Sequence, residues 1–209
     1  MTGGASPGVI LAGGRSSRMG GGDKSLLVLQ GRTLLEHVIA RLGPQADGLV
    51  LNANGDPGRF AGFGLTVVPD TAPDQPGPLA GILSGLRWAA AQRPDCSRII
   101  TAAADTPFMP ADLALRLAEA AEAAGADIAL ARSRGRTHPV FGLWPVALAD
   151  DLEGALDRGE RRVLRFAQRY RLVEVDFPAD PADPFFNVNT PGDLATAESL
   201  IAGGHGILE

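Results

Sequence analysis

The chain has 209 residues, of which 45% are hydrophobic and 21% are charged, the composition of a globular protein large enough to bury a full core. Its net charge of −5 argues against a general nucleic-acid binder, and its single cysteine excludes a disulfide framework or a multi-cysteine metal site. Residues 1–8 lack the basic segment and apolar run of a signal peptide, so we do not expect one, and no apolar run approaches the roughly 20 residues of a membrane span. We expect a cytoplasmic protein without a membrane or nucleic-acid partner, in which residues 8–202 form one domain between flexible termini, 1–7 and 203–209.

The first predicted element, Val9 to Ala12, is a short buried strand that leads into a glycine-rich, basic loop. Glycine costs a helix about 1 kcal/mol, so this composition predicts a loop whose backbone N–H groups approach another molecule closely. Arg15, Arg18 and Lys24 add positive charge, which favours a phosphate as that molecule. Lys24 is the only lysine among 19 basic residues. A compact ammonium suits a phosphate as a point charge, although chance in an arginine-rich chain is the competing explanation.

The loop matches neither of two familiar phosphate-binding motifs. Asp23 separates Gly22 from Lys24, so the Gly-Lys-Ser/Thr of a Walker loop is missing. Gly13-Gly14 leads into a long excursion and not directly into a helix, as the dinucleotide fingerprint requires. The sequence therefore indicates a third design, long enough to fold over a triphosphate.

The next segment alternates helix and strand. Thr33 and Glu36 form a capping-box pattern that opens a helix, and Gly43-Pro44 ends it. Strands are predicted over 48–52 and over 65–68. This alternation is typical of a sheet covered by helices.

Two polar residues follow these strands directly, Asn52 and Asp70. Open α/β sheets bind ligands at the carboxyl ends of their strands, so both side chains are candidate ligand contacts, with turn formation as the competing explanation. A helix from Pro78 to about Gln92 comes next. Gly81 and Gly85 keep one of its faces small, either for a ligand or for tight packing on the sheet.

Asp105 is the best candidate for a metal ligand. It follows a strand over 97–104 that ends in three alanines, which leave room beside it. Capping of the next helix is a weaker explanation, because Pro110 and Asp112 mark that helix start better. One aspartate together with nucleotide phosphates is a normal Mg²⁺ arrangement, since Mg²⁺ keeps several waters and uses phosphate oxygens.

The following region offers fewer chemical signals. Strands are predicted over 127–131 and 137–144, and Pro139 near the start of the second makes it an antiparallel or edge strand. We expect His138 to be a structural hydrogen-bonding residue. Arginines within 154–171 fall on one helical face, which is either a solvated surface or a wall for an anionic second substrate.

The C-terminal region contains a strand over 172–175, a loop rich in proline and acidic residues, and a helix capped by Thr190. Before that cap, Asn187 and Asn189 flank one valine, so their amides project to the same side of an extended segment and either bind substrate or hold loops. Strands and helices alternate about six times, which predicts an α/β fold with a mostly parallel sheet. A Ser-His-Asp set or a reactive cysteine is not evident, so the pattern favours chemistry on a nucleotide phosphate.

The glycine-rich loop resembles the signature of the nucleotidyltransferases with a Rossmann-like, glycosyltransferase-A type fold. Within that superfamily the chain resembles the molybdenum cofactor guanylyltransferases, from about Gly8 to Ile201. The loop alone marks only the superfamily, and its run of three glycines, 20–22, departs from the two that the family usually shows. The more specific motifs, in the family's order, are Pro76-Gly77-Pro78-Leu79-Ala80-Gly81, Asp105-Thr106-Pro107, His138-Pro139, Gly159-Glu160-Arg161-Arg162 and Asn187-Val188-Asn189-Thr190-Pro191.

The resemblance implies a three-layer α/β domain that transfers GMP from GTP to molybdopterin or its molybdenum-bearing form. It implies Mg²⁺ as cofactor, held by Asp105, and other proteins of the cofactor pathway as partners; we expect a monomer. Arg18, Lys24 and the ion on Asp105 are expected to offset the repulsion between the two anionic substrates. Asn187 and Asn189 fall in the segment associated with the pterin. The candidate nucleotide contacts are Leu11, Ala12, Gly13, Gly14, Lys24, Asn52, Asp70 and Asp105.

Three alternatives stay open at this stage. A CTP-dependent molybdopterin cytidylyltransferase or a sugar-phosphate nucleotidyltransferase would share the loop, and residue spacing does not reveal which base or acceptor is recognised. A nucleotide-sensing module would keep the loop without catalysis. Such a sensor has no need of Asp105, which this chain has.

Overall fold

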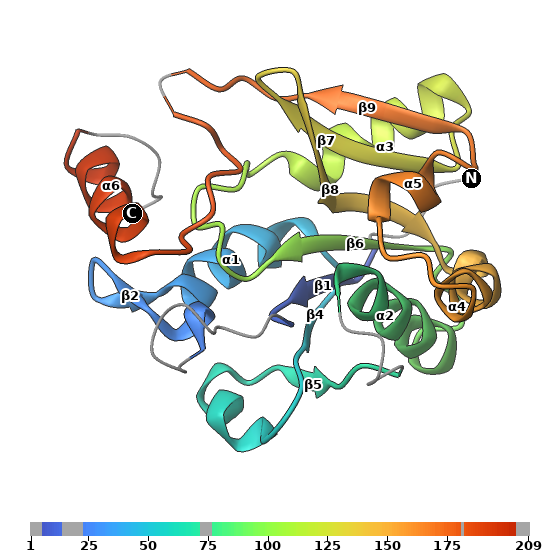
Figure 1. Cartoon of the computed structure of the whole chain (residues 1–209), viewed down its shortest axis with the longest axis horizontal. Helices are drawn as coiled ribbons and strands as arrows, with labels where there is room; N and C mark the ends of the chain where they lie inside the picture. Colours follow the sequence, from blue (N-terminus) through green and yellow to red (C-terminus); the bar gives the residue numbers. More distant parts are fainter. Residues whose placement is uncertain (1–5, 14–22, 72–76, 181, 204–209) are drawn as a thin grey trace.

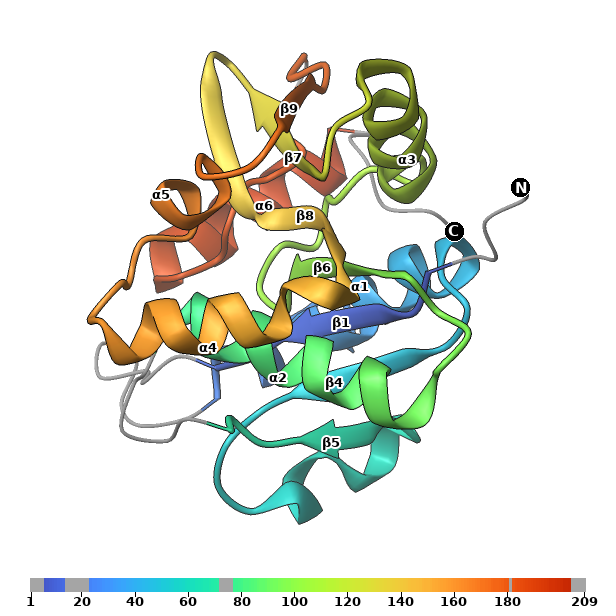
Figure 2. The ribbon, with the colours of Figure 1, turned by 90° about the vertical axis from the view of Figure 1, so that its right-hand side faces the viewer.

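The computed structural model describes residues 6–13, 23–71, 77–180 and 182–203. Within these ranges a seven-stranded sheet has the order β5-β4-β1-β6-β8-β7-β9, and helices cover both of its faces (Figures 1 and 2). Its strands are β1 (Gly8–Leu11), β4 (Leu49–Asn52), β5 (Thr66–Val68), β6 (Arg98–Ala103), β7 (Ile128–Ser133), β8 (Arg136–Pro145) and β9 (Leu172–Asp176).

The sheet is mostly parallel, as the sequence predicts. β5, β4, β1 and β6 pair in parallel, and so do β7 and β9. β8 is antiparallel to both of its neighbours, β6 and β7. The predicted antiparallel strand is therefore confirmed, but the edge position offered as the alternative is wrong, because β8 lies inside the sheet.

An irregularity in the β7–β8 pairing accommodates Pro139 within this interior strand. Leu130 pairs with Gly142, whereas the next residue, Ala131, pairs with His138, so the register shifts between them. Proline lacks the N–H that a regular ladder needs and is tolerated at such bulges. A proline near the start of β8 is thus compatible with strands on both sides.

Two apolar clusters, one on each face of the sheet, hold the helices. Ile10 packs in one cluster with α1 (Leu34–Leu42) and α3 (Leu113–Ala124). Val9 packs in the other with α2 (Pro78–Gln92), α4 (Ala149–Asp157) and α5 (Val163–Ala167). Neighbouring residues of β1 point to opposite faces because successive strand side chains alternate. The chain is therefore a three-layer α/β structure.

The one helical face predicted for the arginines within 154–171 is not formed. α4 ends at Asp157 and α5 begins at Val163, and between them Gly159 has a φ angle of 87°. This left-handed conformation ends helices and is one that glycine adopts without strain. The arginines of this region consequently do not share one helical face.

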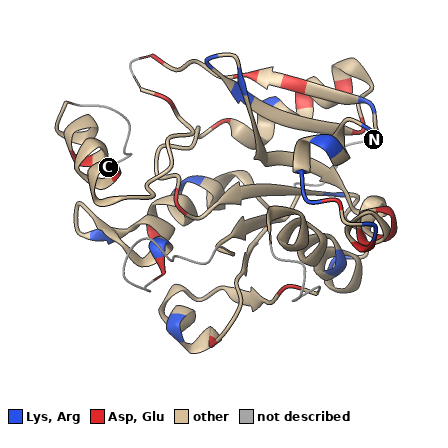
Figure 3. Cartoon of the chain, in the orientation of Figure 1, with Lys and Arg blue, Asp and Glu red and all other residues tan. Residues whose placement is uncertain are grey.

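Three of these arginines, Arg158, Arg165 and Arg169, line an open pocket of about 540 Å³ between α4 and α5, and each has an acidic partner. Arg158 and Arg169 approach Asp151 at 3.8 and 3.0 Å, and Arg165 pairs with Glu160 at 3.3 Å. Acidic residues of α4 and basic residues near α5 accordingly lie side by side (Figure 3). Charge pairing of this kind favours the solvated surface over a purely electropositive wall.

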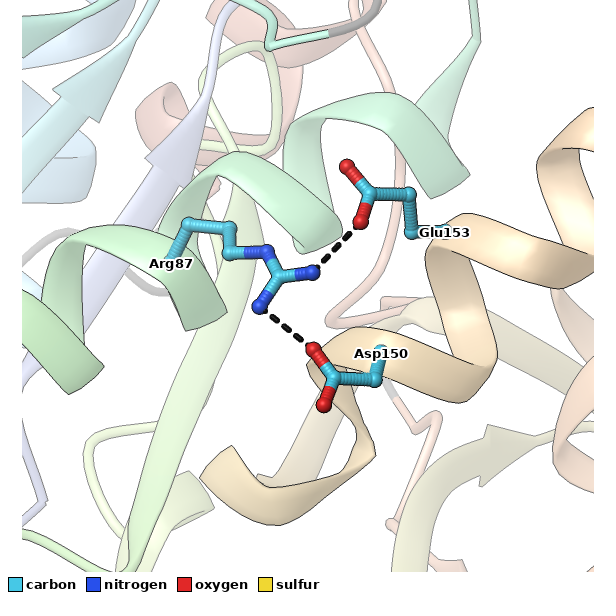
Figure 4. A network of polar contacts seen from close by, with 3 residues as sticks. All are labelled: Arg87, Asp150 and Glu153. Atoms are coloured by element: carbon cyan, nitrogen blue, oxygen red, sulfur yellow. Dashed lines mark hydrogen bonds and ion pairs between the residues drawn. The ribbon is translucent and has the colours of Figure 1, made fainter.

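An ion-pair fork joins α4 to α2. Arg87 of α2 extends between two carboxylates of α4 and contacts Asp150 at 2.6 Å and Glu153 at 2.5 Å (Figure 4). All three side chains are at least partly exposed, so the fork fixes helix orientation and contributes little stability.

The C-terminal helix packs against a hairpin from the first part of the chain. The hairpin consists of β2 (Val28–Leu29) and β3 (Arg32–Thr33), and α6 (Pro191–Ala202) lies beside it (Figure 1). Buried side chains from both regions, including Leu29 and Ala197, form a third apolar cluster. This packing brings the segment before α6 close to the end of the glycine-rich loop. None of the helices in the described ranges has the length and hydropathy that a membrane span needs.

Candidate functional site

The candidate residues lie at one edge of the sheet. Because β5, β4, β1 and β6 are parallel neighbours, their carboxyl ends meet at the same edge. Leu11 ends β1, Asn52 ends β4, and Asp105 lies just beyond β6. Backbone bonds continue past the strands, from Ala12 N–H to the Asn52 carbonyl at 2.9 Å and from Ala104 N–H to the Leu11 carbonyl at 3.1 Å. This edge is where open α/β sheets bind ligands.

Asn52 and Asp70 are in direct contact at this edge. The Asn52 amide is buried and donates to Asp70 Oδ1 at 2.9 Å and to the Val68 carbonyl at 3.1 Å. The Asn54 amide donates to Asp70 Oδ2 at 2.7 Å, and its own oxygen accepts from the Asp70 N–H at 2.8 Å. Two amides thus hold both oxygens of the Asp70 carboxylate. Asn54, which lies in the turn after β4, was not among the predicted contacts.

Helix α2 packs closely on the other side of Asn52. A Cβ atom on Gly81 would lie 2.4 Å from Asn52 Oδ1 and 3.0 Å from Leu11 Cδ2. A Cβ atom on Gly85 would lie 2.8 Å from the side chain of Val9. Both glycines therefore serve tight packing of the helix on the sheet, which decides between the two explanations for the small face of this helix.

The start of the glycine-rich loop lies beside Asn52. Gly13 is exposed directly after β1, and Asn52 Oδ1 is 3.6 Å from the position that a Cβ atom on Gly13 would take. Gly14 and Arg18 lie outside the described residues, so their proposed contacts stay predictions.

The other end of the loop is tied to the same edge by Arg59, another residue that the sequence analysis missed. Arg59 lies in the short 3-10 helix η3 (Pro57–Phe63) and forms an ion pair with Asp23 at 2.6 Å. Its guanidinium also donates to the Asn54 carbonyl. Asp23, and with it Lys24, is thereby held near the Asn52–Asp70 contact.

Lys24 reaches the segment that precedes α6. Its ammonium donates to Asn189 Oδ1 at 3.0 Å, across 165 positions in sequence. The Val188 N–H donates to the Asp105 carbonyl at 2.9 Å, so this segment runs beside the residue that follows β6. Lys24 and Asp105 therefore lie at the same edge, and both contact this short segment.

The Asp105 carboxyl has an unusual electrostatic environment. Burial raises its pKa above the ordinary value, and its own N–H and the Lys24 ammonium only partly oppose this shift. Its ionised form is thus incompletely compensated by the protein. A bound cation would supply the missing charge.

The donor set fits a metal ion shared with substrate. Among the residues that the structure describes, no group of three or more His, Cys, Asp or Glu side chains converges on a metal position. An ion on Asp105 would take its remaining ligands from phosphate oxygens and water, which Mg²⁺ commonly does.

Two other candidate residues, Asn187 and His138, have hydrogen-bond partners in the structure. The Thr106 hydroxyl donates to Asn187 Oδ1 at 2.6 Å, which the sequence analysis did not foresee. His138 bonds through Nε2 to Ser133 Oγ at 2.7 Å and stacks on Phe185 with ring centroids 4.6 Å apart. The structural, hydrogen-bonding role expected for His138 is confirmed.

Comparisons with known proteins agree on one family. The family described as MobA-like NTP transferase domain matches residues 8–174. The chain is 59% identical over 199 residues to a molybdenum cofactor guanylyltransferase of Bradyrhizobium sp. (strain ORS 278), covering 95% of this chain and 94% of that protein. It is 55% identical over 197 residues to one of Rhodopseudomonas palustris (strain BisB5), covering 94% of each. The crystal structure of molybdopterin-guanine dinucleotide biosynthesis protein A from Archaeoglobus fulgidus is similar with a TM-score of 0.74 at 26% identity, covering 94% of this chain and 99% of that one.

Proposed function

Because the chain belongs to the molybdenum cofactor guanylyltransferases, within the MobA-like NTP transferase family, we propose that it transfers GMP from GTP to the terminal phosphate of molybdopterin or its molybdenum-bearing form. Pyrophosphate is the second product. The observation that best supports this proposal is the meeting of Lys24 and Asp105 around the segment that carries Asn187 and Asn189.

The reaction requires compensation of negative charge and does not require a general base. The attacking group is a phosphate oxygen, which is already ionised at neutral pH. The main barrier is the repulsion between two anionic substrates. Lys24 offsets part of that charge, because its ammonium keeps further N–H donors for phosphate oxygens beside the bond to Asn189.

Asp105 is proposed as the protein ligand of a divalent cation, Mg²⁺. When bound, the ion would neutralise phosphate charge and favour departure of pyrophosphate. Asp105 contributes a carboxylate that burial leaves under-compensated, and the backbone bond from Val188 to its carbonyl fixes its position. Arg18 is proposed to add positive charge from the glycine-rich loop.

The remaining contacts divide between the two substrates. We propose that the nucleotide lies along the β1 end, over the backbone of residues 11–14, with Asn52 and Asp70 as side-chain contacts. Asn187 and Asn189 are proposed to face the pterin substrate. We also propose that the enzyme acts as a monomer in the cytoplasm, where GTP is available; gel filtration would test the oligomeric state.

The test is pyrophosphate release from purified protein with molybdopterin, Mg²⁺ and each of the four nucleoside triphosphates in turn. Release with GTP supports the proposal. Release only with CTP, or only when a sugar phosphate replaces molybdopterin, would refute guanylyl transfer. No release with any acceptor would favour a nucleotide sensor.

Two variants test the proposed charges. Lys24→Ala and Asp105→Ala should each lower turnover at least ~100-fold, as the loss of one preorganised charge commonly does. Asp95→Ala is the matched control, because this exposed carboxylate precedes β6 at the opposite end of the strand. A near-normal rate in the Lys24 or Asp105 variant would remove that residue from the mechanism.

A further inference from the structure

We propose that Thr106 is a positioning residue for the acceptor substrate, because it fixes the orientation of the Asn187 amide; this inference rests on the proposed function. Thr106 directly follows Asp105 and is completely buried. Its hydroxyl is 2.6 Å from Asn187 Oδ1 and 3.5 Å from Asp105 Oδ1. A buried hydroxyl needs a hydrogen bond, and these two oxygens compete for its proton.

The distances decide that competition. A hydroxyl that donates to a carboxylate lies about 2.5–2.7 Å from it, so a separation of 3.5 Å is too long for a strong bond to Asp105. The bond to Asn187 has the length of a well-formed hydrogen bond. Thr106 therefore donates to Asn187, and the amide must present its oxygen, and not its nitrogen, to the buried hydroxyl.

This orientation places the N–H donors of Asn187 on its exposed side. The side chain of Asn187 is exposed although its oxygen is held from the interior. The oxygen and nitrogen of an amide point in different directions, so Nδ2 is turned away from Thr106. Among the described residues, no group accepts a hydrogen bond from this nitrogen. Asn187 thus offers N–H donors outward, which suits an anionic acceptor.

The neighbouring residues keep the whole segment in place. Val188 is completely buried and donates its N–H to the Asp105 carbonyl, and Asn189 accepts from Lys24. Residues 187–189 are therefore anchored one after another to the groups proposed to handle metal and triphosphate. The Nδ2 donor of Asn187 is therefore held at a fixed place relative to Lys24 and Asp105. The bond from Thr106 determines that the amide presents this nitrogen, and not its oxygen, to the outside.

Replacing Thr106 by valine tests the inference, because valine keeps the shape and removes the hydroxyl. We expect the KM for molybdopterin to rise about tenfold, the effect of losing one well-placed hydrogen bond, while kcat and the KM for GTP stay within about twofold. Thr106→Ser keeps the hydroxyl and should restore the wild-type KM. In an Asn187→Ala background, Thr106→Val should not raise the KM for molybdopterin any further.

The outcomes separate this inference from the proposed function. Isothermal titration of molybdopterin into wild type and Thr106→Val gives affinity without turnover, and thermal unfolding shows whether the variants fold. An unchanged KM for molybdopterin in a folded valine variant would overturn the role of Thr106. So would a lower kcat that added Mg²⁺ restores, because the hydroxyl would then act on Asp105. Neither result would contradict guanylyl transfer itself. If wild type neither binds molybdopterin nor releases pyrophosphate, the proposed function fails, and the inference with it.

Discussion

Replacing Gly81 by alanine is expected to weaken GTP binding at least tenfold in a protein that still folds. The added methyl would lie 2.4 Å from Asn52 Oδ1, closer than any real contact, so either the helix or the amide has to move. The amide is the softer element, because its rotation requires no shift of backbone. Its rotation would break its bonds to Val68 and Asp70.

Two opposing contributions determine the change in the free energy of unfolding of Gly81→Ala. Alanine recovers about 1 kcal/mol of helix propensity relative to glycine, whereas overpacking costs about 1–3 kcal/mol. The free energy of unfolding should therefore fall by about 0–2 kcal/mol. Rotation of Asn52 also releases Asp70, so both side chains would leave the positions proposed to contact GTP. Losing one such hydrogen bond, or one to a charged group, costs about 1.5 kcal/mol or more of binding free energy, and the KM for GTP should rise about tenfold or more.

Gly85→Ala provides the matched control. Its methyl would meet side-chain atoms of Val9 and Ile99 at 2.8 to 3.2 Å, which is similar crowding on the same helix without a polar partner. Steady-state kinetics and thermal unfolding of both variants test the reasoning. Similar losses of stability with a raised KM only in Gly81→Ala are expected. An equal KM for GTP in the two variants would refute the link between Gly81 and Asn52.

Three further predictions concern stability. Thr190→Ala should lower the free energy of unfolding in urea by about 1 kcal/mol, because the capping box of α6 is lost; no change would mean that the cap contributes nothing. Arg87→Met should cost less than about 1 kcal/mol for each exposed ion pair, and a loss that persists at high salt would contradict an electrostatic origin. Burial lowers the pKa of His138, so the unfolded state binds more protons below about pH 6.5 and stability falls as the pH drops through that value. His138→Gln should flatten this part of the profile, and an unchanged slope would assign it to another group.

Local signals in the sequence predicted most of the fold. The capping box at Thr33 is formed as expected, with Thr33 Oγ1 accepting from the Glu36 N–H at 3.1 Å. The helix predicted from Pro78 to about Gln92 has those bounds in the structure. These elements depend on residues only a few positions apart, and such short-range patterns are visible in a single sequence.

The errors arose where tertiary structure overrides local pattern. Arginine spacing suggested a continuous helix, but Gly159 takes a positive φ angle that one glycine in a sequence does not reveal. Pro139 suggested an edge, but a register shift between β7 and β8 lets its strand lie inside the sheet.

The candidate site was only partly predictable for the same reason. Lys24, Asp70 and Asp105 stand out through composition and position after strands. Arg59 and Thr106 do not, because their importance comes from partners far along the chain: Thr106 bonds to a residue 81 positions away. Only the folded arrangement identifies such contacts.

The interior position of β8 has a consequence for the way the sheet is completed during synthesis. The ribosome delivers β6, then β7, and only afterwards the strand that lies between them. Until then the rim of β6 exposes unpaired backbone groups that invite intermolecular association. Arg134 and Gly135 both have positive φ angles, 48° and 75°, the geometry of a tight two-residue reversal. The missing strand therefore arrives by a local fold-back, which shortens the interval in which a nascent chain is vulnerable to aggregation.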